Sequence, residues 1–164
     1  MIYLALDQAL KTTGFAVFND NELVKWGTFT TNSTLPIEQR LGTFWTQLNK
    51  LSEKCIIDEI FLEDIQQQKG NVETYKKLCY VQAAIYLWCY FNSIPCSILG
   101  SSHWRKIIKE KYQVNFGKVR AEQKKAAQQF VEQQFNLDIS EDEADAVAIG
   151  VAGIQENKRN RSAF

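Results

Sequence analysis

Apolar residues along the chain follow two spacings, one typical of strands and one typical of helices. Short apolar runs bounded by turn residues predict five strands, over residues 2–7, 15–20, 23–31, 57–65 and 94–99. Only the turns KTTG and NDNE separate the first three runs, so these runs are expected to pair as consecutive hairpins.

Longer segments place apolar residues at helical spacing. After the break TNSTLP, the residues Ile37, Leu41, Phe44 and Leu48 share one face of a predicted helix. Further helices are predicted over 72–92, 101–112, 119–135 and from near Ser140 to about Gly153. Hairpin strands followed by alternating helices and strands predict an α/β fold with a mixed five-stranded sheet.

The chain has 164 residues, which fits one domain. We assign the domain to residues 1–155 and expect residues 156–164, ENKRNRSAF, to form a polar, frayed tail. No apolar run reaches about 18 residues, so no membrane span is expected. The N-terminus lacks the basic region and cleavage site of a signal peptide, so a cytoplasmic location is expected.

The sequence contains four cysteines and one histidine, His103, without the clustered spacing of a zinc site. All four cysteines lie in or beside apolar segments, at Cys55, Cys79, Cys89 and Cys96. They are expected to be reduced thiols that pack as small apolar side chains.

A net charge of zero hides a strong charge separation along the chain. Residues 101–125 carry eight basic residues and two acidic ones, whereas residues 126–145 carry six acidic residues and no basic one. A metal-dependent enzyme that acts on a polyanion would show this pattern, but so would two solvated helices. Charge alone leaves both interpretations open.

The densest group of acidic residues opens the last predicted helix, in EDEADAVAIG. Asp142 and Asp145 are three residues apart, so they share one helical face. That face continues to Ile149 and Ala152, which are expected in the core. The two carboxylates should therefore point toward the protein body.

The neighbouring acidic residues have a simpler explanation at a helix start. Ser140 and Glu143 have the spacing of a capping box. Acidic residues also interact favourably with the N-terminal end of the helix dipole. Glu141 lies one turn from Asp145 and stays a candidate for the site.

Two predicted strands also end in carboxylates. Asp7 ends the first strand, and Glu63 and Asp64 end the fourth. Consecutive strand residues face opposite ways, so only one of the latter two can face Asp7. Each residue alone is explained as an ordinary turn residue, but ligands in open α/β sheets usually bind at strand ends.

The combination of these carboxylates points to a metal site. Two carboxylates at about 4 Å repel by about 4 kcal/mol at an effective dielectric near 20. A cluster of four therefore requires a cation or large pKa shifts. Without His or Cys ligands, carboxylates select hard ions such as Mg²⁺ or Mn²⁺, and two such ions suit phosphodiester hydrolysis.

Three segments resemble the motifs of RuvC-type Holliday junction resolvases. LALDQALKTTGFAV resembles the first motif, IFLED the second with its glutamate at Glu63, and DEADAVAIG the last. Their order and spacing match over roughly residues 1–155.

The resemblance implies an RNase H-like fold and a metal-dependent endonuclease that resolves four-way DNA junctions. By the resemblance, Asp7, Glu63, Asp142 and Asp145 are catalytic and hold two Mg²⁺ or Mn²⁺ ions. The family acts as a homodimer in which each subunit nicks one strand, which suits a two-fold symmetric junction. The apolar helix around residues 78–91 is a candidate dimer surface, or alternatively an ordinary core helix.

The basic segment is then expected to bind DNA phosphates without reading the sequence. Lys124 and either Arg105 or Lys106 are nearest to the basic residues that the family places beside its active site. Trp104 is expected in the core. The full set of predicted DNA-binding residues is Lys11, Arg105, Lys106, Lys118, Arg120, Lys124 and Lys125.

One segment departs from the family pattern. Some bacterial members carry an aromatic residue shortly after the second-motif glutamate, where it stacks at the junction centre. This chain has Gln66, Gln67 and Gln68 there, in a loop expected to be polar and mobile. A broader endonuclease for branched DNA is therefore an alternative function.

Three other functions share some of these features. Ribonuclease H shares four carboxylates, but its glutamate lies on the first long helix, where this chain has only Glu38 and Glu53. The phosphate loop of actin-like and sugar-kinase ATPases also has an Asp shortly before a Thr-Gly pair. These ATPases consist of two lobes, for which this chain is too short, and it lacks a second glycine-rich phosphate loop. A junction-binding module without catalysis would not need the complete carboxylate set.

Overall fold

The computed structural model describes residues 1–67 and 70–162 and contains one mixed five-stranded sheet. The strand order is β3-β2-β1-β4-β5. β1, β2 and β3 are antiparallel, whereas β4 and β5 continue parallel to β1. The bounds are β1 Ile2–Asp7, β2 Thr12–Asn19, β3 Glu22–Thr30, β4 Glu59–Glu63 and β5 Cys96–Leu99. The predicted α/β fold is confirmed.

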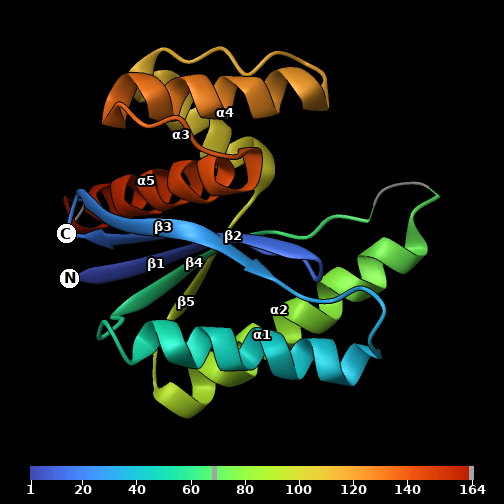
Figure 1. The fold of residues 1–164 in the computed structure, drawn as a ribbon. Helices are drawn as coiled ribbons and strands as arrows, with labels where there is room; N and C mark the ends of the chain where they lie inside the picture. Colours follow the sequence, from blue (N-terminus) through green and yellow to red (C-terminus); the bar gives the residue numbers. More distant parts are fainter. Residues whose placement is uncertain (68–69, 163–164) are drawn as a thin grey trace.

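Five described helices cover the two faces of this sheet (Figure 1). Their bounds are α1 Ile37–Ser52, α2 Val72–Asn92, α3 Ser101–Tyr112, α4 Arg120–Phe135 and α5 Glu141–Ser162. α1 and α2 lie on one face, and α5 lies on the other, with α3 and α4 packed against α5. In the part of the chain that is described, every helix is too short or too polar to cross a bilayer.

The alternation of strand side chains divides the core between the two faces. Toward α1 and α2 point large aliphatic side chains, namely Leu4, Leu6, Val17, Ile60 and Leu62. Toward α5 point Tyr3, Ala5, Ala16, Phe18 and Phe61. The second set includes two alanines, so the sheet is locally thinner on the α5 side.

Two glycines of α5, Gly150 and Gly153, pack against this part of the sheet. A Cβ atom on Gly150 would lie 2.3 Å from the Phe18 ring and 3.0 Å from Cβ of Ala5. A Cβ atom on Gly153 would lie 2.6 Å from the Phe61 ring. Glycine at these positions therefore lets α5 lie directly on the strands.

The start of β2 differs from the expectation. The KTTG segment was predicted as a turn, but Thr12, Thr13 and Gly14 already belong to β2. They pair with the end of β3, with Thr12 opposite Thr30. This long-range pairing extends the strand beyond its apolar part.

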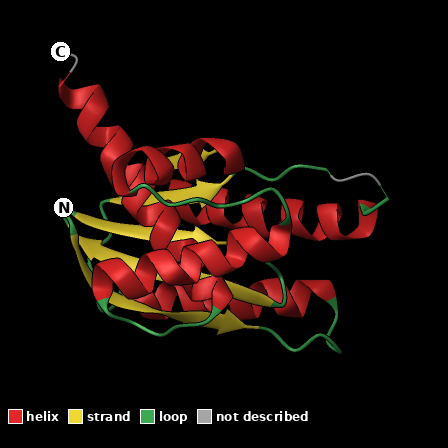
Figure 2. Ribbon diagram, turned by 90° about the horizontal axis from the view of Figure 1, so that it is seen from above, coloured by secondary structure: helices red, strands yellow, loops and turns green. Residues whose placement is uncertain are grey.

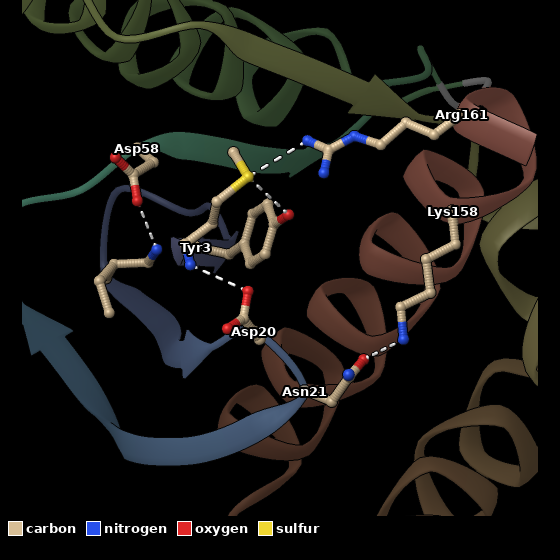
Figure 3. Close-up of polar contacts among 8 residues, drawn as sticks. Tyr3, Asp20, Asn21, Asp58, Lys158 and Arg161 are labelled. Atoms are coloured by element: carbon tan, nitrogen blue, oxygen red, sulfur yellow. Dashed lines mark hydrogen bonds and ion pairs between the residues drawn. The ribbon is translucent and has the colours of Figure 1, made fainter. Parts of the chain in front are cut away.

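The end of α5 also differs, because the helix continues to Ser162 instead of ending near Gly153 (Figure 2). Polar contacts hold these last turns against the rest of the fold. Asn157 Nδ2 donates to Glu59 Oε2 at 2.7 Å. Lys158 Nζ donates to Asn21 Oδ1 at 2.6 Å, as Figure 3 shows. The predicted frayed tail is therefore wrong for residues 156–162, while residues 163–164 lie outside the described part.

Candidate active site

The four predicted carboxylates come from three elements at one end of the sheet. Asp7 is the last residue of β1 and Glu63 the last residue of β4. These strands are neighbours and parallel, so their carboxyl ends meet at the same edge. Asp142 and Asp145 lie in the first turns of α5.

Gly14 allows α5 to start beside Asp7. In the antiparallel register, Gly14 pairs directly with Asp7. A Cβ atom on Gly14 would lie 1.9 Å from the backbone oxygen of Asp142 and 3.1 Å from the backbone nitrogen of Glu143. The start of α5 thus rests on the bare backbone of β2, which only glycine permits.

The capping box at this helix start is confirmed. Glu143 Oε2 accepts from the Ser140 backbone N–H at 2.9 Å, and the Glu143 N–H faces Ser140 Oγ at 3.4 Å. Glu143 is therefore occupied by the cap. Asp142 and Asp145 are left for the side of the helix that faces the sheet edge.

A cleft of about 250 Å³ opens between these elements. Its lining combines three of the carboxylates with basic and amide side chains: Asp7, Glu63, Gln66, Ser101, Arg105, Arg120, Gln123, Lys124 and Asp145. Asp142 adjoins it, with Oδ1 3.5 Å from Lys124 Nζ. The structure thus brings all four predicted carboxylates to one place.

Basic side chains from α3 and α4 pair with acidic side chains around the cleft, Glu141 among them. Lys124 Nζ lies 2.9 Å from Glu141 Oε2, and Arg105 Nη2 lies 3.6 Å from Glu63 Oε1. Lys106 instead pairs with Glu110 on the exposed side of α3, at 3.7 Å. Of the two alternatives from the sequence, Arg105 is the residue beside the cleft.

The remaining predicted residues lie around the cleft or away from it. Arg120 lines the cleft. Lys11, Lys118 and Lys125 are exposed and are not part of its lining. Asp64, the neighbour of Glu63, is exposed, in agreement with the expected alternation along the strand.

The electrostatics of the cleft reflect the crowding of negative charge. Burial raises the pKa of Asp7 well above its ordinary value, and the charges of Asp145 and Glu63 raise it further. Burial also raises the pKa of Asp145, from 3.8 to about 7, although Lys124 opposes this shift. Both carboxylates therefore resist ionisation even with Lys124 nearby, and a further cation would favour their charged forms.

This donor set fits a hard divalent cation. The ligand atoms are carboxylate oxygens, which Mg²⁺ and Mn²⁺ prefer. Within the described residues, no three acidic, histidine or cysteine side chains already surround a single point in ligating geometry. Lys124 and Arg105 supply part of the compensating positive charge around these carboxylates.

The residues that hold Glu63 could not be predicted from the sequence. The indole Nε1 of Trp104 donates to Glu63 Oε1 at 2.8 Å, and Gln8 Nε2 donates to the Glu63 backbone oxygen at 2.5 Å. Trp104 is buried, as predicted, but its indole N–H donates to a carboxylate that lines the cleft. Ser101 and Gln123 in the lining were also not predicted, because no motif or spacing marked them, whereas Gln66 belongs to the Gln-rich loop already noted after Glu63.

Comparison with known proteins gives a match at the level of structure. No protein-family model and no curated protein matches the chain. A solved structure of Thermus thermophilus RuvC in complex with Holliday junction substrate superposes with a TM-score of 0.77, at 14% identity over 96% of each chain. The chain has the RuvC fold.

Two further resolvases share this fold. The yeast mitochondrial Holliday junction resolvase Ydc2 matches with a TM-score of 0.63 at 14% identity, covering 98% of this chain and 80% of its own. The fowlpox virus resolvase, solved with Holliday junction DNA, matches with a TM-score of 0.59 at 13% identity, covering 96% and 99%. The predicted RNase H-like fold is confirmed, and the candidate active site lies on a RuvC fold.

Proposed function

We propose that this protein is a metal-dependent endonuclease that resolves four-way DNA junctions by hydrolysing paired phosphodiester bonds. The observation that carries the proposal is the meeting of Asp7, Glu63, Asp142 and Asp145 around one cleft. Basic residues from α3 and α4 flank this cleft, and the fold is that of solved resolvases.

In the proposal, the four carboxylates hold the metal ions and Asp7 has the central place among them. Asp7 is central, because the charges of the other three carboxylates all act on it. The four side chains would hold two Mg²⁺ or Mn²⁺ ions, which supply an activated hydroxide and stabilise the leaving oxygen. Arg105 and Lys124 neutralise the site before the cations and the DNA arrive.

Phosphate contacts would position the junction. Arg105, Arg120 and Lys124 face the cleft, so they are placed to meet the phosphates next to the scissile bond. Lys11, Lys106, Lys118 and Lys125 are exposed and would add contacts to the DNA arms.

A homodimer completes the proposal. One side of α2 exposes large apolar residues that the core does not cover: Tyr80, Tyr86, Leu87, Tyr90 and Phe91. Tyr90 and Phe91 are 78% and 70% exposed, which is unusual for neighbouring aromatic residues at a protein surface. Two copies related by a two-fold axis through this surface would bury it and present two clefts to one junction.

One observation favours a broader substrate range as the second candidate. Gln66 lines the cleft three residues after the end of β4 and so presents a polar side chain there. A glutamine forms adaptable hydrogen bonds and does not stack strongly on a base. Ribonuclease H is disfavoured, because Glu38 in α1 and Glu53 just after it are exposed, and α1 lies on the sheet face opposite α5.

A cleavage assay tests the proposal. End-labelled four-way junction, three-way junction, fork, linear duplex and RNA–DNA hybrid are each incubated with the protein in Mg²⁺ and in EDTA. Paired nicks on the four-way junction, lost in EDTA and in Asp7→Asn, are expected. The Asp7→Asn variant should still fold and still bind the junction, with cleavage reduced by at least about a thousandfold.

Other results would revise the proposal in different ways. Cleavage of every branched DNA would support the broader endonuclease. Cleavage confined to the hybrid would identify a ribonuclease H. Unchanged cleavage by Asp7→Asn would disprove the assignment of the site.

A further inference from the structure

We propose that Trp104 is a positioning residue for Glu63, and that its indole N–H sets which carboxylate oxygen faces the cleft. The inference rests on the proposed function, because it concerns a carboxylate of that site. It assigns a role to a residue that composition and spacing place only in the core.

Trp104 is fixed by its surroundings. Its side chain is 1% exposed and belongs to the core between α3 and α5. Its ring meets the Phe116 ring edge to face, with centroids 5.4 Å apart and an interplanar angle of 89°. A ring packed in this way has one orientation, so its N–H points in one fixed direction.

That fixed N–H holds one oxygen of Glu63. The distance from Trp104 Nε1 to Glu63 Oε1 is 2.8 Å. An indole N–H is only a donor and a carboxylate is only an acceptor, so the two groups match without ambiguity. A hydrogen bond to a charged acceptor is also stronger than one between neutral groups.

Arg105 depends on the same tryptophan. Its guanidinium carbon lies 4.5 Å from the centroid of the Trp104 ring, in a cation–π contact. Arg105 Nη2 then reaches Glu63 Oε1 at 3.6 Å. Within the described residues, both side-chain contacts of the carboxylate therefore go to Oε1, which leaves Oε2 for a ligand in the cleft.

The backbone of Glu63 is held as well. Gln8, the buried residue after Asp7, donates to the Glu63 carbonyl oxygen at 2.5 Å. Glu63 is thus fixed at its backbone by Gln8 and at its side chain by Trp104. Residues that orient a metal-binding carboxylate in this way typically change metal affinity or activity by about 10- to 100-fold when they are replaced.

The chain offers a matched control in Trp88. This tryptophan is also fully buried, and its Nε1 donates to a side chain, Asn49 Oδ1, at 2.7 Å. It lies in the core on the other face of the sheet, with no carboxylate of the cleft as its partner. Trp88→Phe therefore removes the same chemical group as Trp104→Phe without touching the site.

The first measurement observes the hydrogen bond directly. The full chain has four tryptophans, so ¹⁵N-labelled indoles give four N–H signals, which Trp104→Phe and Trp88→Phe assign. Glu63→Gln and addition of Mg²⁺ should each shift the Trp104 signal and leave the Trp88 signal in place. A Trp104 signal that Glu63→Gln does not move would overturn the inference, even if no Trp104 variant folds.

The second measurement separates positioning from packing. Trp104→Phe should lower the single-turnover cleavage rate of a four-way junction by about 10- to 100-fold, or raise the Mg²⁺ requirement by a similar factor. Junction affinity, measured by fluorescence anisotropy in Ca²⁺, should stay within about twofold of wild type. Trp88→Phe should stay close to wild type in both rate and affinity.

Two outcomes of this assay would contradict the positioning role of Trp104. Wild-type cleavage by Trp104→Phe, or equal losses in both tryptophan variants, would reduce Trp104 to a packing residue. Failure of the wild-type protein to cut any junction would instead refute the proposed function. The indole signals would still decide whether Trp104 holds Glu63.

Discussion

Each face of the sheet buries one tryptophan completely, and the two tryptophans use their indole N–H groups differently. Trp88, on α2, donates to the neutral amide of Asn49 on α1. Trp104, on α3, donates to the carboxylate of Glu63 at the edge of the cleft. The same side chain ties two helices together on one face and orients a charged group on the other.

The faces also differ in how closely their helices approach the strands. On the α1–α2 face, large aliphatic side chains keep the helices at a distance. On the α5 face, Gly14, Gly150 and Gly153 bring the helix backbone onto the strands. The comparison shows that the site depends on close backbone packing, because only this packing places the start of α5 beside Asp7.

The largest effect on the packing of the α5 face is expected when Gly14 is replaced by alanine. The added Cβ would meet the Asp142 backbone oxygen at 1.9 Å, and backbone cannot move aside as a flexible side chain does. Gly14→Ala should lose about 3 kcal/mol of unfolding free energy and most of the cleavage activity. Urea denaturation and the junction assay measure the two effects.

Gly42 on α1 provides the control for this prediction. A Cβ atom there meets nothing within 4 Å, and the position is exposed in a helix. Gly42→Ala should therefore stabilise the protein by up to about 1 kcal/mol and leave cleavage unchanged. Equal behaviour of the two variants would refute the role of close packing.

The second prediction tests the apolar side of α2. Leu87→Glu combined with Phe91→Glu should convert the proposed dimer to a monomer in analytical ultracentrifugation, because both side chains are more than half exposed in the single chain. Stability of the subunit itself should change by less than about 0.5 kcal/mol per substitution. Val24→Glu on β3, at a site that is 48% exposed, should leave the oligomeric state unchanged.

The third prediction concerns pH and the α5 face. Burial raises the pKa of Asp145 from 3.8 to about 7, so the folded protein holds this proton more tightly than the unfolded chain does. Without metal, the stability contribution of Asp145 is therefore present below about pH 4 and is lost as the pH rises toward 7. Asp145→Asn removes the carboxylate whose ionisation destabilises the folded protein, so it should raise the Tm in EDTA at pH 8. The expected rise is about 2–4 °C for each kcal/mol of unfolding free energy that is regained.

The pH dependence supplies its own control. The Tm difference between Asp145→Asn and wild type should shrink toward zero as the pH is lowered to 4. Added Mg²⁺ at pH 8 should stabilise wild type more than the variant. A Tm difference that is independent of pH would show that ionisation of Asp145 is not the cause.

The smallest effect is expected at the far end of α5. Arg159 pairs with Glu110 at 3.5 Å, and both side chains are about half exposed. Arg159→Ala should cost no more than about 0.5 kcal/mol in urea denaturation and should not alter cleavage. A loss above about 1 kcal/mol would mean that this surface pair couples to the core.

Local patterns were sufficient to predict much of this protein. Alternation and helical spacing predicted all five strands and five helices of the described chain. The shared face of Asp142 and Asp145 and the Ser140–Glu143 cap follow from one turn of helix, so they could be predicted without knowing the rest of the fold. The carboxylates at the ends of the first and fourth strands could be recognised in the same way.

Other features depend on contacts between distant parts of the chain. α5 continues past Gly153 because Glu59, 98 residues away from Asn157 in sequence, accepts a hydrogen bond from it. Arg105 faces the cleft and Lys106 does not, because the packing of α3 against α5 sets the rotation of the helix.

Local patterns identify the residue types that carry the chemistry and the elements on which they lie, because periodicity and capping act over a few residues. Only the packing of the folded chain brings Trp104 to Glu63, 41 residues earlier, and the start of α5 onto Gly14. Such contacts require two elements to be placed to within a fraction of an ångström. That placement results from the packing of the whole core and not from any local pattern.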